Sequence, residues 1–270
     1  MGNGGGLRGP IALVGAGEFL PTMAEVDQAL LAAVGRAQPR VAVVPTAAAQ
    51  EGQASMERWA AMGLAHFRAL GAVPEAVYVA DRADAEDPSL CRALVAADLV
   101  YFSGGDPAYL VQTLAASAAW AAVAAAHEAG GALAGCSAGA MALAAATLDF
   151  RASRDGPPRW LPGWGAAPGL AVLPHFDRLQ RSRSAWVAAL VAAAPAGISV
   201  VGIDEHTVLV DLGAGWRVMG QGAVSVLAGA GRQVYRAGEA PGLLGAPDET
   251  PNTWCEPAGS PGVDDEPWNT

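Results

Sequence analysis

In the first half of the chain, short runs of β-branched and aromatic residues alternate with longer stretches rich in alanine and leucine. Such alternation is typical of βαβ units, whose strands assemble into a mostly parallel sheet with helices on its faces. The pattern predicts strands at 11–15, 41–44, 77–79 and 99–102, with helices at 22–34 and 53–70 among them. The expected fold class is therefore α/β.

The second half of the chain is less regular. Prolines, glycines and two tryptophans at 151–169 predict a loop, and a helix is expected at 181–194. From 199 to 236, short turns separate strand-like runs, which predicts antiparallel strands toward the C-terminus. We expect a single α/β domain over 10–236, with flexible tails at 1–9 and at 237–270, where proline, glycine and acidic residues accumulate.

Composition excludes several classes of function. The formal net charge of −10 argues against a nucleic-acid partner. All 16 basic residues are arginine, so lysine-dependent Schiff-base and P-loop chemistry is ruled out. The three cysteines are too widely spaced for a disulfide framework or a zinc site, and we expect neither a metal nor an organic cofactor. Without a signal-like or membrane-spanning segment, the expectation is a cytoplasmic protein with no membrane partner.

The pentapeptide Gly135-Cys136-Ser137-Ala138-Gly139 lies between an apolar run at 131–134 and a helix-like run at 140–146. A G-x-S-x-G turn between a strand and a helix is the context of a nucleophile elbow. Side chains at the flanking glycines would collide with the neighbouring strand and helix. The pattern predicts that Ser137 is a nucleophile, against the alternative of a purely structural turn.

A nucleophilic serine needs a base, and four histidines are available. His66 and His127 lie in helical segments, where we expect surface or packing roles. His175 follows the apolar run 170–174, at the predicted carboxyl end of a strand, where the sites of open α/β sheets collect. His206 lies between two predicted strands and is the rival base, with Asp177 as its acid in the chain order of α/β-hydrolases.

Together these segments resemble the cyanophycinase and peptidase E family of serine peptidases, in consistent order from residue 10 to about 230. Besides the pentapeptide, Phe102-Ser103-Gly104-Gly105-Asp106 looks like that family's oxyanion loop. His175-Phe176 looks like its catalytic histidine, and Gly202-Ile203-Asp204-Glu205 looks like its triad acid segment.

The resemblance implies a flavodoxin-like, mostly parallel sheet of the class I glutamine amidotransferase type. It also implies Ser137 as nucleophile, His175 as general base and Glu205 as orienting acid, with Asp204 as the alternative acid. The backbone N–H groups of Gly105 and Ala138 would form the oxyanion hole.

The same resemblance implies that Asp106, Arg181 and Arg183 bind substrate, since arginine holds carboxylates through two parallel hydrogen bonds. The expected partner is a small, acidic or β-linked peptide, and a homodimer is implied. Pro107, Leu173 and Pro174 stand where cyanophycinases carry polar residues, which argues against cyanophycin itself.

Two alternatives keep the fold and change the function. In a glutamine amidotransferase the nucleophile would be a cysteine, but Cys136 is out of register because Ala134 and Ala138 flank it two residues away. The other alternative is a catalytically silent small-molecule-binding protein that retains the turn.

Overall fold

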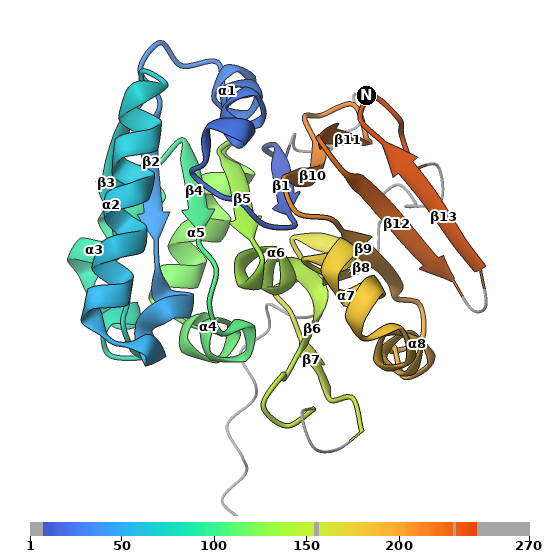
Figure 1. The fold of residues 1–270 in the computed structure, drawn as a ribbon. Helices are drawn as coiled ribbons and strands as arrows, with labels where there is room; N and C mark the ends of the chain where they lie inside the picture. The colour runs from blue at the N-terminus through green and yellow to red at the C-terminus, as the bar shows by residue number, and fades with distance from the viewer. Residues whose placement is uncertain (1–7, 154–156, 229–230, 242–270) are drawn as a thin grey trace, which may run out of the picture.

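The computed structural model describes residues 8–153, 157–228 and 231–241, so the predicted tails lie mostly outside the described residues. Within them the chain forms two sheets flanked by helices, and the expected α/β class is confirmed (Figure 1). The division into two sheets was not anticipated from the sequence. It matters because the chain crosses between the sheets at the residues that form the candidate site.

The first sheet has the strand order β11-β10-β1-β5-β4-β2-β3. Its five strands from β1 to β3 are parallel, while β10 and β11 are antiparallel additions at the other edge. The bounds are β1 Ile11–Val14, β2 Arg40–Val44, β3 Val73–Ala76, β4 Leu99–Phe102, β5 Ala132–Cys136, β10 Thr207–Asp211 and β11 Trp216–Gly220.

The second sheet has the order β13-β12-β9-β8-β6-β7, with β6, β8 and β9 parallel. The other three strands pair antiparallel, which was expected for β12 and β13 in the C-terminal part and not for β7. The bounds are β6 Ala144–Leu148, β7 Trp160–Pro162, β8 Ala167–Leu173, β9 Ser199–Ile203, β12 Ala223–Ala228 and β13 Gly231–Arg236.

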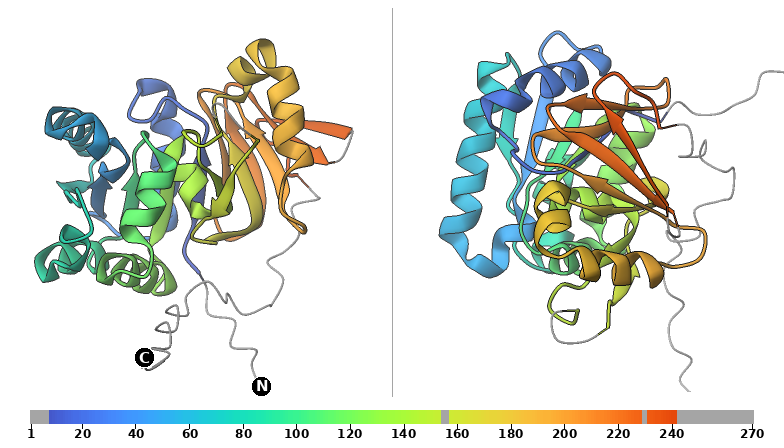
Figure 2. Two further views of the ribbon diagram at one scale, coloured as in Figure 1. Left: turned by 90° about the horizontal axis from the view of Figure 1, so that it is seen from below. Right: turned by 45° about the vertical axis from the view of Figure 1, so that its right-hand side comes forward.

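Eight α-helices and three short 3₁₀ turns connect the described strands. The helices are α1 Ala24–Ala33, α2 Gln53–Ala69, α3 Pro88–Val95, α4 Pro107–Leu114, α5 Ala118–Glu128, α6 Ala138–Leu143, α7 Phe176–Ser182 and α8 Ser184–Ala192; the turns are η1 Pro21–Met23, η2 Thr46–Glu51 and η3 Asp84–Glu86. In Figures 1 and 2, α1 to α5 surround the first sheet, and α7 and α8 accompany the second.

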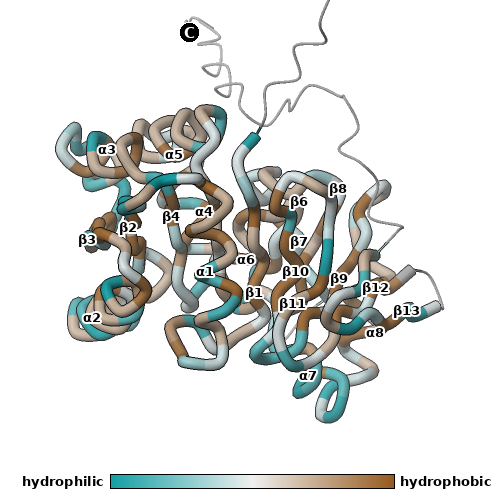
Figure 3. Tube along the Cα trace, turned by 90° about the horizontal axis from the view of Figure 1, so that it is seen from above, coloured by the Kyte–Doolittle hydropathy of each residue, from teal (hydrophilic) through white to brown (hydrophobic). Residues whose placement is uncertain are grey.

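Strand alternation divides the core of the first sheet between its two faces. Ala12 and Val14 pack on one face with side chains of α1 and α2. Ile11 and Leu13 face the opposite way, into a larger cluster that includes α3 to α6 and the strands of the second sheet. The strands are the brown interior in Figure 3, whereas α2 and α7 carry much of the hydrophilic exterior.

Four local predictions differ from the structure. The helix-like run at 140–146 is helical only as far as Leu143, and residues 144–146 begin strand β6. The third strand is Val73–Ala76, not 77–79, and it pairs only with β2. Pro74 disfavours a strand in sequence, but an edge strand tolerates proline because one side makes no ladder bonds. The loop expected at 151–169 contains β7 and the start of β8, and the helix expected at 181–194 is two helices that meet at Arg183.

No described helix is, by itself, long and apolar enough to cross a membrane. Only α4 and α5 taken together reach that length and composition, and they are bent by 92° at their junction. In the part of the chain that the structure describes, no three His, Cys, Asp or Glu side chains are grouped so that they could hold a metal ion.

Candidate active site

The carboxyl ends of strands from both sheets meet at one pocket of about 530 Å³. Segments after β1, β4 and β5 enter it from the first sheet, and segments after β8 and β9 from the second. The carboxyl edge is where open α/β sheets bind ligands. The side chains that line it include Glu18, Arg58, Trp59, Ser137, His175, Arg178, Glu205 and His206.

Ser137 lies at a sharp turn between β5 and α6. Its backbone has φ +50° and ψ −106°, a conformation that L residues rarely adopt. The flanking glycines are sterically required: a Cβ on Gly135 would lie 2.3 Å from the Gly139 carbonyl carbon, and one on Gly139 would lie 2.4 Å from the Phe102 carbonyl oxygen. The local sequence therefore allows this turn, which brings Ser137 to the pocket.

Hydrogen bonds link Ser137 to a histidine and then to a carboxylate. Ser137 Oγ lies 3.3 Å from His175 Nε2, and His175 Nδ1 lies 2.7 Å from Glu205 Oε1. The His175 side chain is 40% exposed and that of Glu205 is 18% exposed, so the base is open to the pocket and its acid partner is sheltered. The arrangement is that of a nucleophile, a base and an orienting acid.

Glu205 is held by α7 as well as by His175. Its Oε2 forms an ion pair with the Arg178 guanidinium at 2.9 Å, and its backbone N–H donates to Asp177 Oδ1 at 3.2 Å. Burial raises the pKa of Asp177, but hydrogen bonds from the Glu205 N–H and Arg181 outweigh that effect and leave the pKa below its ordinary value. The Asp177 carboxylate therefore holds the Glu205 backbone in place by accepting its N–H.

The structure does not assemble the rival sets of residues. Asp204 points away from His175 and accepts the Ala223 N–H at 3.0 Å. His206 reaches the pocket lining, but its Nδ1 lies 3.0 Å from Thr22 Oγ1. Asp177 serves the Glu205 backbone instead of His206.

The two amides expected at the oxyanion hole belong to different segments, because Gly105 lies between β4 and α4 and Ala138 is the first residue of α6. Among the described residues, neither the Gly105 N–H nor the Ala138 N–H has a hydrogen-bond acceptor. Gly105 has φ +144°, and a Cβ there would lie 2.2 Å from the Ala47 carbonyl oxygen. Both N–H groups are thus unpaired within the described residues, and of the two residues only Gly105 lines the pocket.

Cys136 points away from Ser137 into the interior. It is fully buried, and its Sγ donates to Glu18 Oε2 at 2.7 Å. Burial, followed by the charge of Glu18, raises the pKa of this thiol well above its ordinary value. Because the thiolate is the reactive form of cysteine, the geometry does not favour Cys136 as a nucleophile.

The residues expected to bind substrate lie outside the pocket lining. Asp106 caps α4 by accepting the Tyr109 N–H at 3.0 Å and pairs with Arg151 at 3.0 Å. Arg181 pairs with Asp177 on the same helix, and Arg183 is exposed at the junction of α7 and α8.

Two other arginines line the pocket and were missed from the sequence. Arg178 lies three residues after His175, so both lie at the start of one helix. This spacing could have identified Arg178 as a pocket residue from the sequence. Arg58 lies on α2 beside Trp59, and no sequence signal connects α2 with the residues around Ser137.

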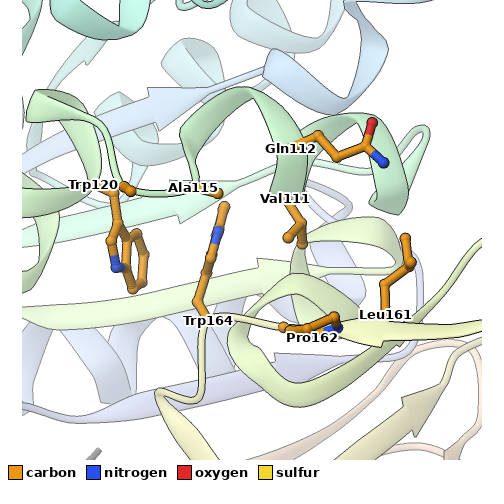
Figure 4. A pocket seen from close by; sticks show the side chains of 9 residues that line it. Val111, Gln112, Ala115, Trp120, Leu161, Pro162 and Trp164 are labelled. Carbon is orange, nitrogen blue, oxygen red and sulfur yellow. The ribbon is translucent and has the colours of Figure 1, made fainter. Parts of the chain in front are cut away.

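A second pocket, of about 240 Å³, lies between the α4–α5 turn and the segment that follows β7 (Figure 4). The indole rings of Trp120 and Trp164 stack there with centroids 4.5 Å apart. No titratable side chain is among its lining residues, so it offers no acid, base or nucleophile.

Comparison with known proteins identifies the family of the chain. The model of Peptidase family S51 matches residues 11–218. A peptidase from an acI-B1 Actinobacterium is 34% identical, with a TM-score of 0.79 over 88% of this chain and 98% of that chain. A protein assigned as peptidase E from Listeria monocytogenes EGD-e shares the fold at 15% identity, with a TM-score of 0.53 over 85% of this chain and 98% of that one. None of the curated proteins compared matches the chain. Since the family match spans most of the chain and includes every residue of the hydrogen-bonded series from Ser137 to Glu205, the protein belongs to peptidase family S51 and is a serine-type peptidase.

Proposed function

We propose that this protein hydrolyses small, acidic or β-linked peptides in the manner of peptidase E, through an acyl-enzyme on Ser137. The observation that carries the proposal is the hydrogen-bonded series from Ser137 Oγ through His175 to Glu205. In this reading the turn at Ser137 is a nucleophile elbow.

His175 Nε2 takes the proton of Ser137 Oγ as the oxygen attacks the scissile carbonyl carbon. The carbonyl oxygen becomes an oxyanion, which accepts hydrogen bonds from the Gly105 and Ala138 N–H groups. Glu205 holds the ring through Nδ1 and stabilises the imidazolium. When the tetrahedral intermediate collapses, the C–N bond breaks and His175 returns its proton to the leaving amine. Water, deprotonated by His175, then attacks the acyl ester, and His175 returns that proton to Ser137 Oγ as the C–O bond breaks and the acid product leaves.

The pocket favours a short substrate that carries a carboxylate. Its volume of about 530 Å³ suits a molecule of dipeptide size. Arg178 and Arg58 are its arginines, and Arg58 lies 4.0 Å from Glu51, at the outer distance for an ion pair. Arg178 already pairs with Glu205 at 2.9 Å. We therefore assign carboxylate recognition mainly to Arg58, instead of Arg181 and Arg183.

A dipeptide panel tests this function. The intact protein should cleave peptides with aspartyl or β-aspartyl residues before the scissile bond faster than their asparaginyl counterparts. Ser137→Ala should lower kcat on the order of 10⁴-fold or more and abolish fluorophosphonate labelling, with an unchanged melting temperature. Labelling that survives Ser137→Ala would remove Ser137 as the nucleophile, and equal rates on acidic and amide peptides would contradict the substrate class.

A further inference from the structure

Glu18 is a buried carboxylate beside the reacting residues that takes no part in the steps above. It follows β1, is 6% exposed, and lines the floor of the pocket. Among the ion pairs of the described residues, none includes Glu18. A carboxylate buried without a cation requires hydrogen-bond donors to compensate for lost hydration.

Two donors satisfy Glu18, and each comes from a different part of the site. Oε1 accepts the backbone N–H of Gly104 at 3.0 Å, and Oε2 accepts the thiol of Cys136 at 2.7 Å. Gly104 directly precedes Gly105, and Cys136 directly precedes Ser137. One side chain thus connects the loop that carries the first oxyanion donor to the turn that carries the nucleophile and the second donor.

The space between these segments is tight. A Cβ placed on Gly104 would lie 3.1 Å from Glu18 Oε1 and 3.6 Å from Ser137 Cβ. Glu18 and Ser137 therefore border the same small volume, so a shift of the carboxylate would move the Gly104–Gly105 segment relative to Ser137. Oxyanion donors act only within a narrow range, about 2.7–3.1 Å from the charged oxygen.

We propose that Glu18 is a positioning residue that holds the Gly104–Gly105 loop and the Cys136–Ser137 turn at the separation that the oxyanion requires. This proposal rests on the function proposed above. It also explains why Cys136 keeps its proton: the thiol serves as the hydrogen-bond donor to Glu18.

The charge of Glu18 allows a positional role to be distinguished from an electrostatic one. A carboxylate near a developing oxyanion repels it, so neutralising Glu18 would accelerate the reaction if charge were its main effect. If Glu18 acts by position, Glu18→Gln slows the reaction instead, because an amide offers one acceptor oxygen where the carboxylate offers two.

The test uses a fluorophosphonate, whose phosphoryl oxygen occupies the oxyanion hole, so no natural substrate is needed. For Glu18→Gln we expect the maximal labelling rate constant to fall about 10-fold, less than the 10²–10³ typical of losing a donor outright, with unchanged half-saturation. A merely structural role would reduce the fraction of protein that labels and leave the rate of the folded fraction unchanged. Glu75→Gln, on the far edge strand β3, is the matched control and should label at the original rate.

Cys136 provides a second, independent series in case Glu18→Gln does not fold. Cys136→Ala removes the donor and should slow labelling several-fold, whereas Cys136→Ser restores an O–H donor and should recover most of the rate. Cys91→Ala is the control, since Cys91 lies on α3 outside the pocket.

The outcomes are distinguishable from failure of the proposed function. If the unchanged protein is not labelled, the proposed function fails. If it is labelled and Glu18→Gln reacts as fast or faster, or if Cys136→Ala and Cys136→Ser react alike, the role of Glu18 is overturned while Ser137 remains the nucleophile.

Discussion

His175 Nδ1 lies 2.7 Å from Glu205 Oε1. Both residues follow parallel strands of the second sheet, and His175 in turn contacts Ser137, which follows a strand of the first sheet. His175 follows β8 and Glu205 follows β9, which are hydrogen-bonded neighbours. Only residues 204–206 separate β9 from β10, and β10 belongs to the first sheet. The β9–β10 connection, one of the places where the chain passes between the sheets, therefore brings Glu205 to His175.

Replacing Glu205 with glutamine should lower kcat by on the order of 10²–10⁴-fold, because an amide can hold the wrong tautomer of His175 and cannot stabilise the imidazolium. Asp204→Asn is the matched control: its carboxylate accepts from Ala223 and points away from His175, so kcat should stay the same. Steady-state hydrolysis of the best dipeptide checks both. A larger loss in Asp204→Asn than in Glu205→Gln would exchange the roles of the two residues.

Arg178→Gln should lower kcat/KM up to about 10-fold, since Arg178 holds Glu205 at 2.9 Å and lines the pocket. Arg181 lies on the same helix, outside the pocket, so Arg181→Gln is the control and should change kcat/KM less than 2-fold. Kinetics on one acidic dipeptide measure the contrast. A rise in KM confined to Arg181→Gln would instead support the substrate role that the family resemblance implied.

Gly105→Ala should destabilise the fold by about 1–3 kcal/mol and strongly reduce kcat. The φ of Gly105 is +144°, and the new Cβ would lie 2.2 Å from the Ala47 carbonyl oxygen, so the loop must move and take the oxyanion donor with it. Gly71→Ala is the control, with φ +83° and no atom within 4 Å of the new Cβ. It should lose stability without losing kcat, as thermal melts and rate measurements would reveal; equal kcat in both variants would contradict the role of the Gly105 amide.

The pH dependence of stability should report on Asp204. Burial raises its pKa in the folded state. A carboxyl whose folded pKa is raised favours folding most below its unfolded pKa, near 3.9, and that contribution is lost as pH rises through the folded pKa. The change in Tm on Asp204→Asn should therefore be more favourable at pH 7 than at pH 3.5. Calorimetry at both values tests the sign, and a difference independent of pH would show that the carboxyl titrates normally.

Several parts of the site followed from local sequence alone. The glycines around Ser137 identify a turn that a Cβ at either position would block, and this steric requirement is local. The apolar run before His175 places it at the end of a strand. Asp204 and Glu205 have different partners, the Ala223 N–H and His175, because the chain leaves β9 at Ile203 and turns at Glu205 before β10.

Other parts depended on contacts between distant segments. Arg58 on α2 shares the pocket with Arg178, although 120 positions of sequence numbering separate them. Asp106 is used to cap α4 and to pair with Arg151, a partner that no local pattern indicates. Arg178 and Arg181 lie on the same helix, and the way α7 packs on the sheet decides that Arg178 lines the pocket and Arg181 does not.

By itself, the sequence determined the α/β class and the turn at Ser137, because these depend on hydrophobic periodicity and on local sterics, whereas the order of Ser137, His175 and Glu205 was implied by the family resemblance. Only the tertiary structure decided that the strands divide into two sheets, that Arg58 and Arg178 border the pocket, and that Glu18 bridges Gly104 and Cys136. Those arrangements depend on how separate strands and helices pack against each other, and the hydrogen-bonding partners of a buried side chain are set by that packing.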